Sequence, residues 1–310
     1  MSLSTHTPPD FISPQHIVVA SDLTDVGMLL PHVIAQAKAS HAAVTLVHGV
    51  RSSVLSPLPR EGDPIEIENK YSKQLLCGMK HSIEVEGVPC SIVVKDGLPG
   101  EIVRREIERV GAGRLIIGAH RYSPCGPTMI GAVANALLTF AAVPICVIGP
   151  KMKGHSGHTV PKRILHPVSF SGFSRERASF AAEIAESYGA ELTLLHVIAP
   201  SVTASPYAHD LETRTRRELE MFAGPSGLQV RIVLKYGEPL EEILNLASSE
   251  DSDLIVMGMR HKYPWWSMRN NLAHQVIGES SCPVLTFRDC VLVNAQDEST
   301  SVAYSPIGPS

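Results

Sequence analysis

The sequence predicts an α/β fold made of two doubly wound domains in tandem, each with a five-stranded parallel sheet of the Rossmann-like type. Short apolar runs alternate with segments of helical period, and this alternation implies parallel strands joined by right-handed crossovers. The strand-like runs, such as residues 17–20 and 254–257, are almost wholly apolar, which is typical of a sheet covered by helices on both faces. The pattern occurs twice, and 310 residues are enough for two domains.

Five segments of the first half have similar counterparts in the second half, aligned on shared residues such as His48 with His196 and Gly118 with Gly258. The pairs keep their order at offsets of about 140 to 148 residues, which chance similarity would not preserve, so the chain contains an internal repeat. The pairs are residues 16–22 with 163–169, 44–50 with 192–198, 97–103 with 237–243, 115–118 with 254–258, and 143–145 with 282–284.

The first unit, residues 15–150, opens with a β-rich run at residues 17–21. Residues 25–39 follow with apolar side chains at helical spacing, and residues 44–50 return to an apolar strand pattern. We therefore expect a strand, a covering helix and a second strand in this order.

The rest of the first unit continues the same alternation. Residues 67–86 have the polar and apolar spacing of a surface helix, and residues 91–95 follow as a strand. Pro99 opens the next predicted helix, at residues 99–110, where its missing N–H costs little. The unit closes with a strand at residues 114–118, a helix at 132–141 and a last strand at 145–148.

The second unit, residues 162–288, repeats these elements between Arg163 and Arg288. Residues 151–161 are predicted to link the units, because this stretch is rich in glycine and polar residues. Its two histidines, His155 and His158, are better explained by a solvated linker than by a metal site. Residues 289–310 are predicted to form a polar C-terminal tail.

Composition excludes several classes of protein. The formal net charge is −4, from 27 basic and 31 acidic residues, whereas an electrostatic nucleic-acid binder normally has a basic excess. Aromatic residues make up only 5% of the chain, which argues against a stacking platform for single strands. Hydrophobic residues make up 44%, which argues against a disordered chain. We therefore expect a folded protein that does not bind nucleic acid.

Residues 129–150 carry no charge and are long enough to span a membrane. However, Pro144 and Pro150 interrupt the segment, and its copy in the second unit contains Arg269 and Glu279, which a bilayer core would not accept cheaply. Residues 1–11 contain no basic residue and no apolar run, so we expect no signal peptide, and the six cysteines lack a C-x-x-C pair. We therefore expect a cytoplasmic protein with reduced thiols and no membrane span.

Ligands of doubly wound sheets bind at the carboxyl ends of the strands, where the strand order reverses. After the first strand, Asp22 can accept a hydrogen bond from a ligand donor such as an exocyclic amine, or it can serve only the loop. Thr24 or Asp25 can cap the helix that follows. The loop after the fourth strand runs from Gly118 to a helix start near Gly131, where backbone amides favour phosphate.

The signatures of several enzyme classes are missing. No G-x-G-x-x-G follows the first strand, and the chain contains neither the P-loop G-x-x-x-x-G-K-[ST] nor the hydrolase elbow G-x-S-x-G. His48 and His196 lie in apolar strands and are interpreted as structural, whereas His120 and His261 lie near the predicted cleft and could contact a ligand. We expect no catalytic residues and no metal site.

Together these features resemble the universal stress protein family, in two copies that cover residues 15–288. The resemblance implies the version of the Rossmann-like fold called adenine nucleotide alpha hydrolase-like. In the first copy it rests on the strand leading to Asp22, the strand ending at His48-Gly49-Val50, Gly97-x-Pro99, and the strand running into Gly118. In the second copy it rests on residues 189–197, 253–258 and 282–284.

The family contains ATP binders and non-binders. Binders resemble G-x-x-G-x9-G-[ST], in which backbone amides and a hydroxyl hold the phosphates. The first unit keeps Gly118 and Gly131, but it has Arg121 at the second glycine and Ala132 at the hydroxyl position. His120 stands where many binders have histidine. The contacts to ATP that the resemblance implies are Asp22, Val50 through its backbone, Gly118, His120, Arg121 and Gly131.

The second unit departs further from the ATP-binding pattern, and we expect it not to bind ATP. Gly258 remains, but the residues at the other motif positions have changed. The replacements are His261, Asn271 and Leu272, with Ser169 in the position of Asp22, and Trp265 and Trp266 add bulk for packing or an interface.

The resemblance implies a stress-response protein, and the eroded phosphate motif favours a non-catalytic interaction or regulatory module with a protein partner. The alternative is an adenine-nucleotide sensor acting through the first unit, and a slow ATPase is a third reading. Family members commonly pair through their last strand, and residues 145–148 and 284–287 are apolar enough to do so. We therefore predict that the two units pack edge strand to edge strand as a pseudo-twofold pair. The sequence leaves a homodimer of whole chains open.

Overall fold

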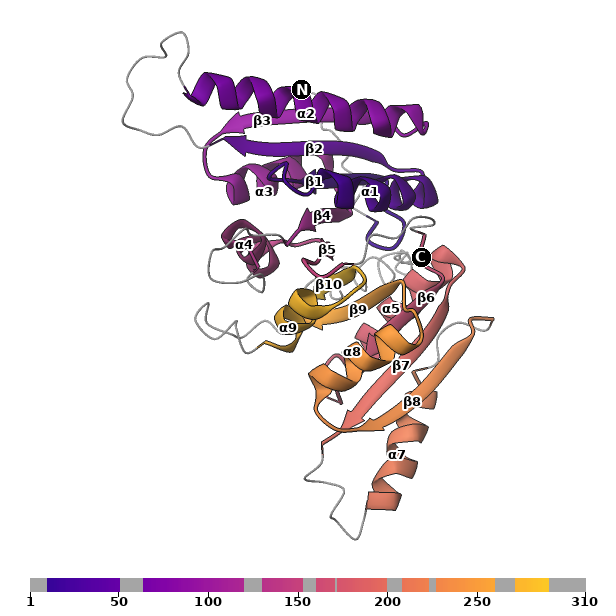
Figure 1. The fold of residues 1–310 in the computed structure, drawn as a ribbon. Coiled ribbons are helices and arrows are strands. Elements are labelled where there is room, and N and C mark those ends of the chain that lie inside the picture. The colour runs from indigo at the N-terminus through magenta and orange to yellow at the C-terminus, as the bar shows by residue number, and fades with distance from the viewer. Residues whose placement is uncertain are drawn as a thin grey trace, which may run out of the picture.

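The computed structural model describes residues 10–50, 64–119, 130–152, 160–170, 172–199, 208–222, 227–259 and 271–289. Its strands form one continuous sheet in the order β3-β2-β1-β4-β5-β10-β9-β6-β7-β8 (Figure 1). Within each unit neighbouring strands are parallel, and the order places the first and fourth strands side by side at the centre. The predicted α/β fold with two doubly wound units in tandem is confirmed.

The elements of the first unit lie close to their predicted positions. They are β1 (His16–Ala20), α1 (Val26–Ser40), β2 (Ala43–Val50), α2 (Pro64–Val85), β3 (Cys90–Asp96), α3 (Pro99–Val110), β4 (Arg114–Gly118), α4 (Ala132–Phe140) and β5 (Ile145–Ile148). The uncharged segment considered for a membrane span thus forms a short helix and a strand. Within the described ranges, the structure contains no helix with the length and apolar character needed to cross a bilayer.

The second unit repeats the same succession of elements. They are β6 (Arg163–Pro167), α5 (Ser174–Tyr188), β7 (Glu191–Ile198), α7 (Ala208–Glu220), β8 (Val230–Tyr236), α8 (Pro239–Ser249), β9 (Leu254–Met259), α9 (Leu272–Glu279) and β10 (Val284–Arg288). Pro99 and Pro239 both begin their helices, and the glycine two residues earlier has a positive φ in each unit, 136° at Gly97 and 152° at Gly237. Glycine adopts this conformation without strain, which explains its place in both copies of the motif.

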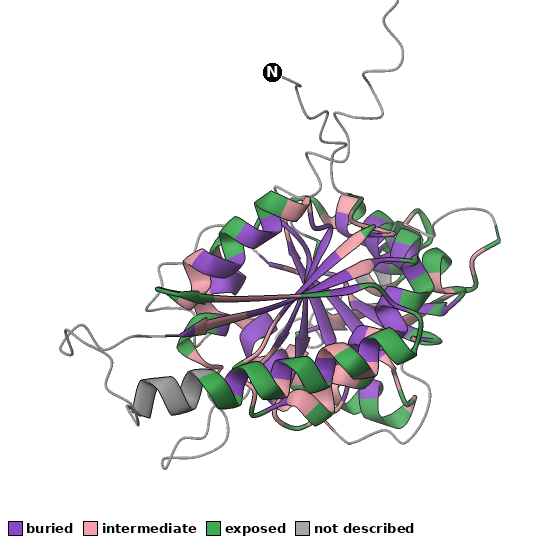
Figure 2. Ribbon diagram, turned by 90° about the horizontal axis from the view of Figure 1, so that it is seen from above, coloured by how far each residue is buried: buried purple, intermediate pink, exposed green. Residues whose placement is uncertain are grey.

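Helices cover both faces of the sheet, as the apolar strands predict. Side chains of α1, α2, α5 and α7 pack on one face, and those of α3, α4, α8 and α9 pack on the other. Figure 2 shows the buried strands fanned out at the centre, with helices around them that expose their outer surfaces. Each of the two apolar layers contains residues from both units, so the core continues across the junction.

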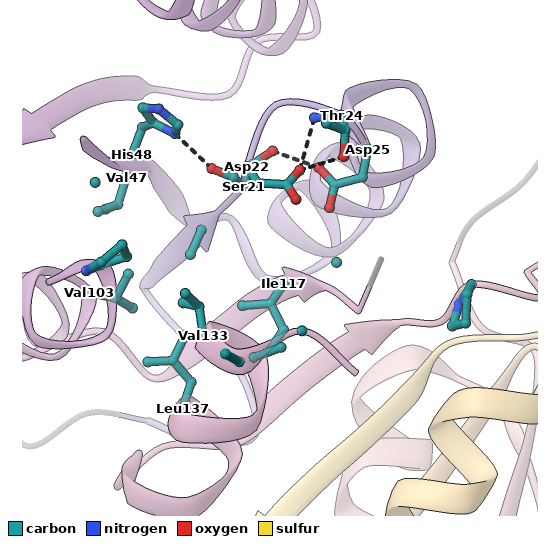
Figure 3. A pocket seen from close by; sticks show the side chains of 18 residues that line it. Ser21, Asp22, Thr24, Asp25, Val47, His48, Val103, Ile117, Val133 and Leu137 are labelled. Carbon is teal, nitrogen blue, oxygen red and sulfur yellow. Dashed lines mark hydrogen bonds between the residues drawn. The ribbon is translucent and has the colours of Figure 1, made fainter. Parts of the chain in front are cut away.

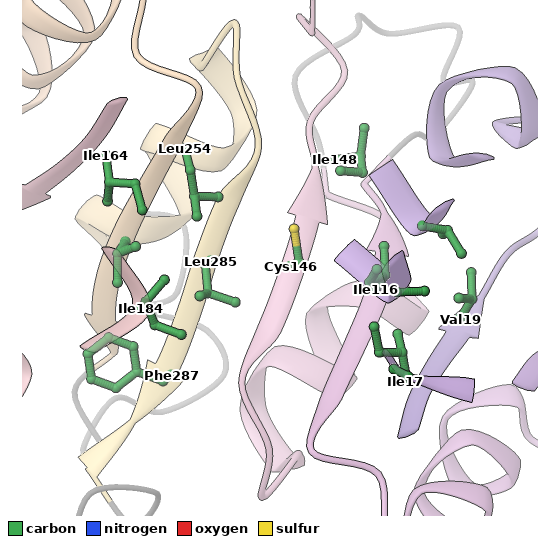
Figure 4. Packing of buried hydrophobic residues seen from close by; sticks show 14 of the residues in the cluster. Ile17, Val19, Ile116, Cys146, Ile148, Ile164, Ile184, Leu254, Leu285 and Phe287 are labelled. Carbon is green, nitrogen blue, oxygen red and sulfur yellow. The ribbon is translucent and has the colours of Figure 1, made fainter. Parts of the chain in front are cut away.

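The two units join through their last strands, β5 and β10, which pair antiparallel. Ile145, Cys146 and Val147 lie opposite Thr286, Leu285 and Val284, respectively, and all six side chains are buried. Figure 4 shows the apolar cluster running from one unit to the other past this pair of strands. The predicted edge-to-edge packing is confirmed, and it removes one exposed edge from each sheet.

Arg114 adds a polar contact to this junction. It is 1% exposed and stands in β4 at the position that Leu254 occupies in β9. Its guanidinium donates to the hydroxyl of Tyr188, on α5 of the other unit, at 2.7 Å. It also donates to the carbonyl oxygens of Phe11 and Ile12, at 3.0 and 3.2 Å. One buried cation therefore fixes both the segment before β1 and the neighbouring unit.

The cysteines in the described part of the chain are unpaired, in agreement with the expectation of free thiols. Cys90, Cys146 and Cys282 are buried, whereas Cys77 is exposed on α2. Burial raises the pKa of Cys90 to about 12 and that of Cys282 to about 11. Because the thiolate is the reactive form, these two side chains act as small apolar residues.

We expect Arg114→Leu to lower the free energy of unfolding by about 3 kcal/mol, because it leaves the partly buried acceptors on Phe11, Ile12 and Tyr188 without their charged donor. Urea unfolding followed by circular dichroism measures this change. Lys38→Gln is the control, since its ion pair with Glu86 is about half exposed and is expected to contribute less than about 1 kcal/mol. Equal stability of the two variants would show that Arg114 does not hold the junction.

Candidate functional site

A cavity of about 830 Å³ in the first unit lies at the carboxyl ends of β1 and β4 (Figure 3). This is the point where the strand order reverses, as expected for a ligand site in a doubly wound sheet. The loop after β1 forms one side and the N-terminus of α4 another. The lining residues are Ala20, Ser21, Asp22, Thr24, Asp25, Val47, His48, Gly49, Pro99, Val103, Ile117, Gly118, Gly131, Ala132, Val133, Ala134, Leu137 and Pro150.

Asp22 lies at the exposed rim of this cavity. Its Oδ1 accepts hydrogen bonds from the backbone N of Thr24 at 2.9 Å and from Oγ1 of Thr24 at 2.6 Å. The carboxylate therefore stabilises the turn and at the same time faces the cavity. The two roles that the sequence left open for Asp22, loop structure and ligand contact, are compatible in this geometry.

Asp25 is the buried acid of the site, at 4% exposure. It occupies the N-cap position of α1 but makes no side-chain capping bond, so of the two caps that the sequence allowed, Thr24 or Asp25, the Asp25 side chain does not act as one. Its Oδ1 instead accepts from Oγ of Ser21 at 2.6 Å. A Cβ at Gly118 would lie only 1.6 Å from Oδ2 of Asp25. Gly118 is thus needed for the carboxylate to pack against the end of β4.

The histidines at the ends of β2 and β7 are structural, as interpreted from the sequence. Nδ1 of His48 lies 3.0 Å from the carbonyl oxygen of Ser21, and Nδ1 of His196 lies 2.9 Å from that of Val168. Each ring ties the second strand of its unit to the loop after the first strand. Figure 3 shows His48 beside the cavity, where it also contributes to the wall.

Val50 does not line the cavity, although it was predicted to contact a ligand through its backbone. Its carbonyl oxygen accepts from the backbone N of Gly97 at 3.1 Å, and the neighbouring Gly49 forms the wall instead. A Cβ at Gly49 would lie 2.9 Å from Cα of Pro99. The end of β2 is therefore in direct contact with the start of α3.

Gly131 lies at the N-cap of α4, and no side chain caps this helix in the described structure. Gly131, Ala132 and Val133 all line the cavity, so the uncapped first turn of the helix faces it. Of the six predicted contacts, Asp22, Gly118 and Gly131 come together here. His120 and Arg121 lie outside the described residues.

The second unit has a smaller cavity, of about 590 Å³, in the corresponding place. Its lining residues are His166, Pro167, Val168, Ser169, Ser174, Arg177, Leu195, His196, Val197, Pro239, Ile243, Met257, Gly258, Asn271, Leu272 and Ala273. Asn271 caps α9, because its side chain accepts from the backbone N of Ala273 at 3.0 Å. His261, Trp265 and Trp266 lie outside the described residues.

Two ionisable side chains at the floor of the second cavity, Arg177 and His166, were not predicted from the sequence. Arg177 packs so closely on Gly258 that a Cβ there would lie 2.5 Å from Cδ of the arginine. His166 is fully buried in β6 at the place of Val19, and its Nδ1 lies 2.7 Å from the carbonyl oxygen of Val256. Burial, together with the nearby Arg177 cation, lowers the pKa of His166 to about 4. Alignment of the two units could have identified both residues. His166 replaces Val19 and Arg177 replaces Leu29, so a polar side chain stands where the first unit has an apolar one.

Comparison with known proteins identifies relatives of each unit and of the whole chain. The chain matches the Universal stress protein family over residues 14–149 and again over residues 161–288. A universal stress protein of Thermus aquaticus is 30% identical over 135 residues, which cover 41% of this chain and 98% of that protein.

Two solved structures resemble the whole chain. The crystal structure of a universal stress protein from Archaeoglobus fulgidus DSM 4304 has a TM-score of 0.67 and 17% identity, covering 88% of this chain and 98% of that one. A functionally unknown protein from Pseudomonas aeruginosa PAO1 has a TM-score of 0.64 and 15% identity, covering 94% of this chain and 99% of that one. At these identities the likeness establishes the fold alone.

We expect Gly118→Ala to destabilise the protein by about 2 kcal/mol or more, because the new Cβ overlaps the Asp25 carboxylate. Chemical denaturation of Gly118→Ala, Asp25→Ala and the double variant forms a thermodynamic cycle. The double variant should recover part of the loss, since the overlapping oxygen is gone. Gly78→Ala, in an open position on α2, should be neutral or slightly stabilising. Strictly additive effects at Gly118 and Asp25 would contradict the packing argument.

We expect stability to fall as the pH drops from about 6.5 to about 4, because unfolded His166 binds a proton that the folded protein excludes. The lowered pKa of His166 contributes about 3 kcal/mol to the free energy of unfolding. This contribution is present above pH 6.5 and is lost towards pH 4. His166→Val, which copies Val19, should flatten this dependence in urea unfolding measured across the pH range. Exposed His81→Gln is the control and should keep the wild-type slope. An unchanged slope in His166→Val would exclude this histidine as the cause.

Proposed function

The chain belongs to the universal stress protein family, and we propose that it is a non-catalytic regulatory module with one weak adenine-nucleotide site, in the first unit. In this proposal the second unit is a structural partner that does not bind nucleotides. An adenine-nucleotide sensor, the alternative that the sequence left open, would use the same site.

The observation that carries the proposal is the difference between the two helix N-termini at the cavities. The first turn of α4 begins at Gly131 without a side-chain cap, so its amides point to where a phosphate can accept hydrogen bonds. In the second unit, Asn271 already supplies an oxygen to the backbone N of Ala273. A side chain of the protein thus takes the place that a phosphate oxygen would need on α9.

The walls of the first cavity suit the nucleoside part of the ligand. Val47, Val103, Ile117 and Leu137 contribute apolar surface, which a flat base can cover. Asp22 at the rim is an acceptor for an exocyclic amine or a ribose hydroxyl. These contacts favour adenosine-like ligands over a bare phosphate.

The same cavity gives three reasons why binding is weak. Ala132 lacks the hydroxyl that ATP-binding members of the family carry at this position. The Asp25 carboxylate packs against Gly118, where it repels a nearby phosphate. Among the described lining residues there is neither lysine nor arginine, so the α4 amides provide the main attraction for a phosphate.

The contacts of Ser21, a hydroxyl in the cavity wall, support a non-catalytic role. Ser21 donates to Asp25 at 2.6 Å, and its oxygen accepts from the backbone N of Leu23 at 2.9 Å. His48 is held by its hydrogen bond to the Ser21 carbonyl oxygen. These side chains fix the loop and are not arranged as a nucleophile with its base.

We expect Gly131→Asn to weaken ATP or AMP binding at least tenfold, because the new side chain would cap α4 as Asn271 caps α9. The cap should stabilise the protein by a few tenths of a kcal/mol, since glycine is itself a tolerated N-cap residue, so lost binding cannot be attributed to unfolding. Calorimetric titration and thermal shift measure the two effects. At ten times the dissociation constant, the wild type should gain about 1.4 kcal/mol of stability.

Asn271→Gly is the matched control, since it uncaps the helix of the other unit. It should lower stability and leave nucleotide affinity as in the wild type. Absence of any shift with millimolar ATP or AMP, with or without magnesium, would refute the nucleotide site. Release of phosphate above a protein-free blank would refute the non-catalytic role.

A further inference from the structure

The cavity of the second unit has a different floor from that of the first, although the two lie at the same place in the repeat. In the first unit a carboxylate, Asp25, packs against the glycine that ends the fourth strand. In the second unit a guanidinium-bearing side chain, Arg177, packs against the corresponding Gly258. The sign of the charge at the floor is therefore reversed between the two cavities.

Arg177 is a buried cation in a position that packing alone would fill with an apolar residue. It is the fourth residue of α5, and the fourth residue of the equally long α1 is the fully buried Leu29. Arg177 is 7% exposed and lines the cavity. Removing a guanidinium from water costs several kcal/mol unless anions and hydrogen bonds compensate. A role for the cation beyond packing is therefore expected.

Asp289, which directly follows β10, neutralises one edge of the guanidinium. Its Oδ1 accepts from Nε and Nη2 of Arg177 at 2.9 and 2.8 Å, and its Oδ2 accepts from Nη2 at 2.9 Å. Asp289 is not among the residues that line the cavity, and its hydrogen bonds to Arg177 use only Nε and Nη2 of the guanidinium. One edge of the guanidinium is thus held by Asp289, and because Arg177 also lines the cavity, its Nη1 is the donor that we assign to an anion there.

The remaining walls suit a small ring. Leu195, Ile243 and Met257 supply apolar surface to the cavity. His196 also lines the cavity. The centroid of its ring lies 4.7 Å from the centroid of the Phe170 ring, and the two ring planes are tilted by 52°. Phe170 lies on the loop after β6, which corresponds to the loop that carries Asp22 in the first unit. A cavity of about 590 Å³ is within the range that holds small organic ligands.

We propose that the second cavity is a binding site for a small aromatic carboxylate, whose anionic group pairs with Arg177 while its ring lies among the apolar walls. Asp289 orients the arginine and lowers its attraction for the ligand, because it is a second negative charge on the same guanidinium. This site is independent of the nucleotide site proposed for the first unit. In this proposal the second unit binds a ligand different from that of the first unit. A phosphate is not expected at the N-terminus of α9, because Asn271 already caps this helix.

The test uses the full chain and benzoate as the probe, with uncharged benzyl alcohol as the isostere that lacks the anion. Saturation-transfer NMR titrations measure the affinity of the wild type, Asp289→Asn and Arg177→Leu. We expect weak benzoate binding to the wild type, at least tenfold tighter binding to Asp289→Asn, and none to Arg177→Leu. Benzyl alcohol should not bind to any of them. Arg175→Leu, on the exposed side of the same helix, should bind benzoate like the wild type.

Circular dichroism establishes that each variant is folded, and Arg177→Leu with Asp289→Asn removes both charges if either single variant is unstable. Equal benzoate affinity of Asp289→Asn and the variants without Arg177 would overturn the proposal, as would absence of saturable binding to Asp289→Asn. Saturating AMP should leave benzoate binding unchanged. Competition between the two would place benzoate in the first unit and refute this assignment.

Discussion

The antiparallel pairing of β5 with β10 is the contact on which the rest of the molecule depends. It turns two five-stranded sheets into one and buries an edge of each. Because the apolar layers on both faces contain residues from both units, neither unit has a closed core of its own at this edge. The pairing also sets the two cavities in fixed positions, since both lie at strands close to the junction. The hydrogen bond from Arg114 to Tyr188 adds a geometrically specific polar contact between the units to this apolar junction.

The two cavities show how a duplicated site can diverge while its scaffold stays the same. The crossovers, the Gly-x-Pro turns and the tethering histidines occur in both units. Differences between the two cavities lie in side chains at the cavity floor, in the loop after the first strand and at one helix N-terminus. A glycine in the first unit is an asparagine in the second, and this one change decides whether the helix amides face open space or a cap. The charge next to the shared glycine is reversed by Asp25 and Arg177.

Periodicity and repetition were enough to predict the elements, the doubly wound units and their edge-to-edge packing, because these follow from local apolar patterns. Motif spacing likewise placed Asp22, Gly118 and Gly131 at one cavity. What it could not supply were contacts between residues far apart in the chain. Arg177 and Asp289 are separated by 112 positions, and nothing in either local sequence indicates the other. Local rules make Asp25, like Thr24, a possible cap of α1, whereas its side chain makes no capping bond and its carboxylate packs on Gly118.

The covalent link between the units has a consequence for how freely each can change. Two separate chains that pair through an edge strand dissociate on dilution, and each must keep a surface that fits an identical copy. In this chain the partner is always present at a high effective concentration, and the two sides of the junction can differ, as Cys146 opposite Leu285 illustrates. A substitution in one unit therefore does not have to occur in the other unit as well. A duplicated protein of this kind can retain an ancestral ligand in one half and acquire new chemistry in the other without losing its fold.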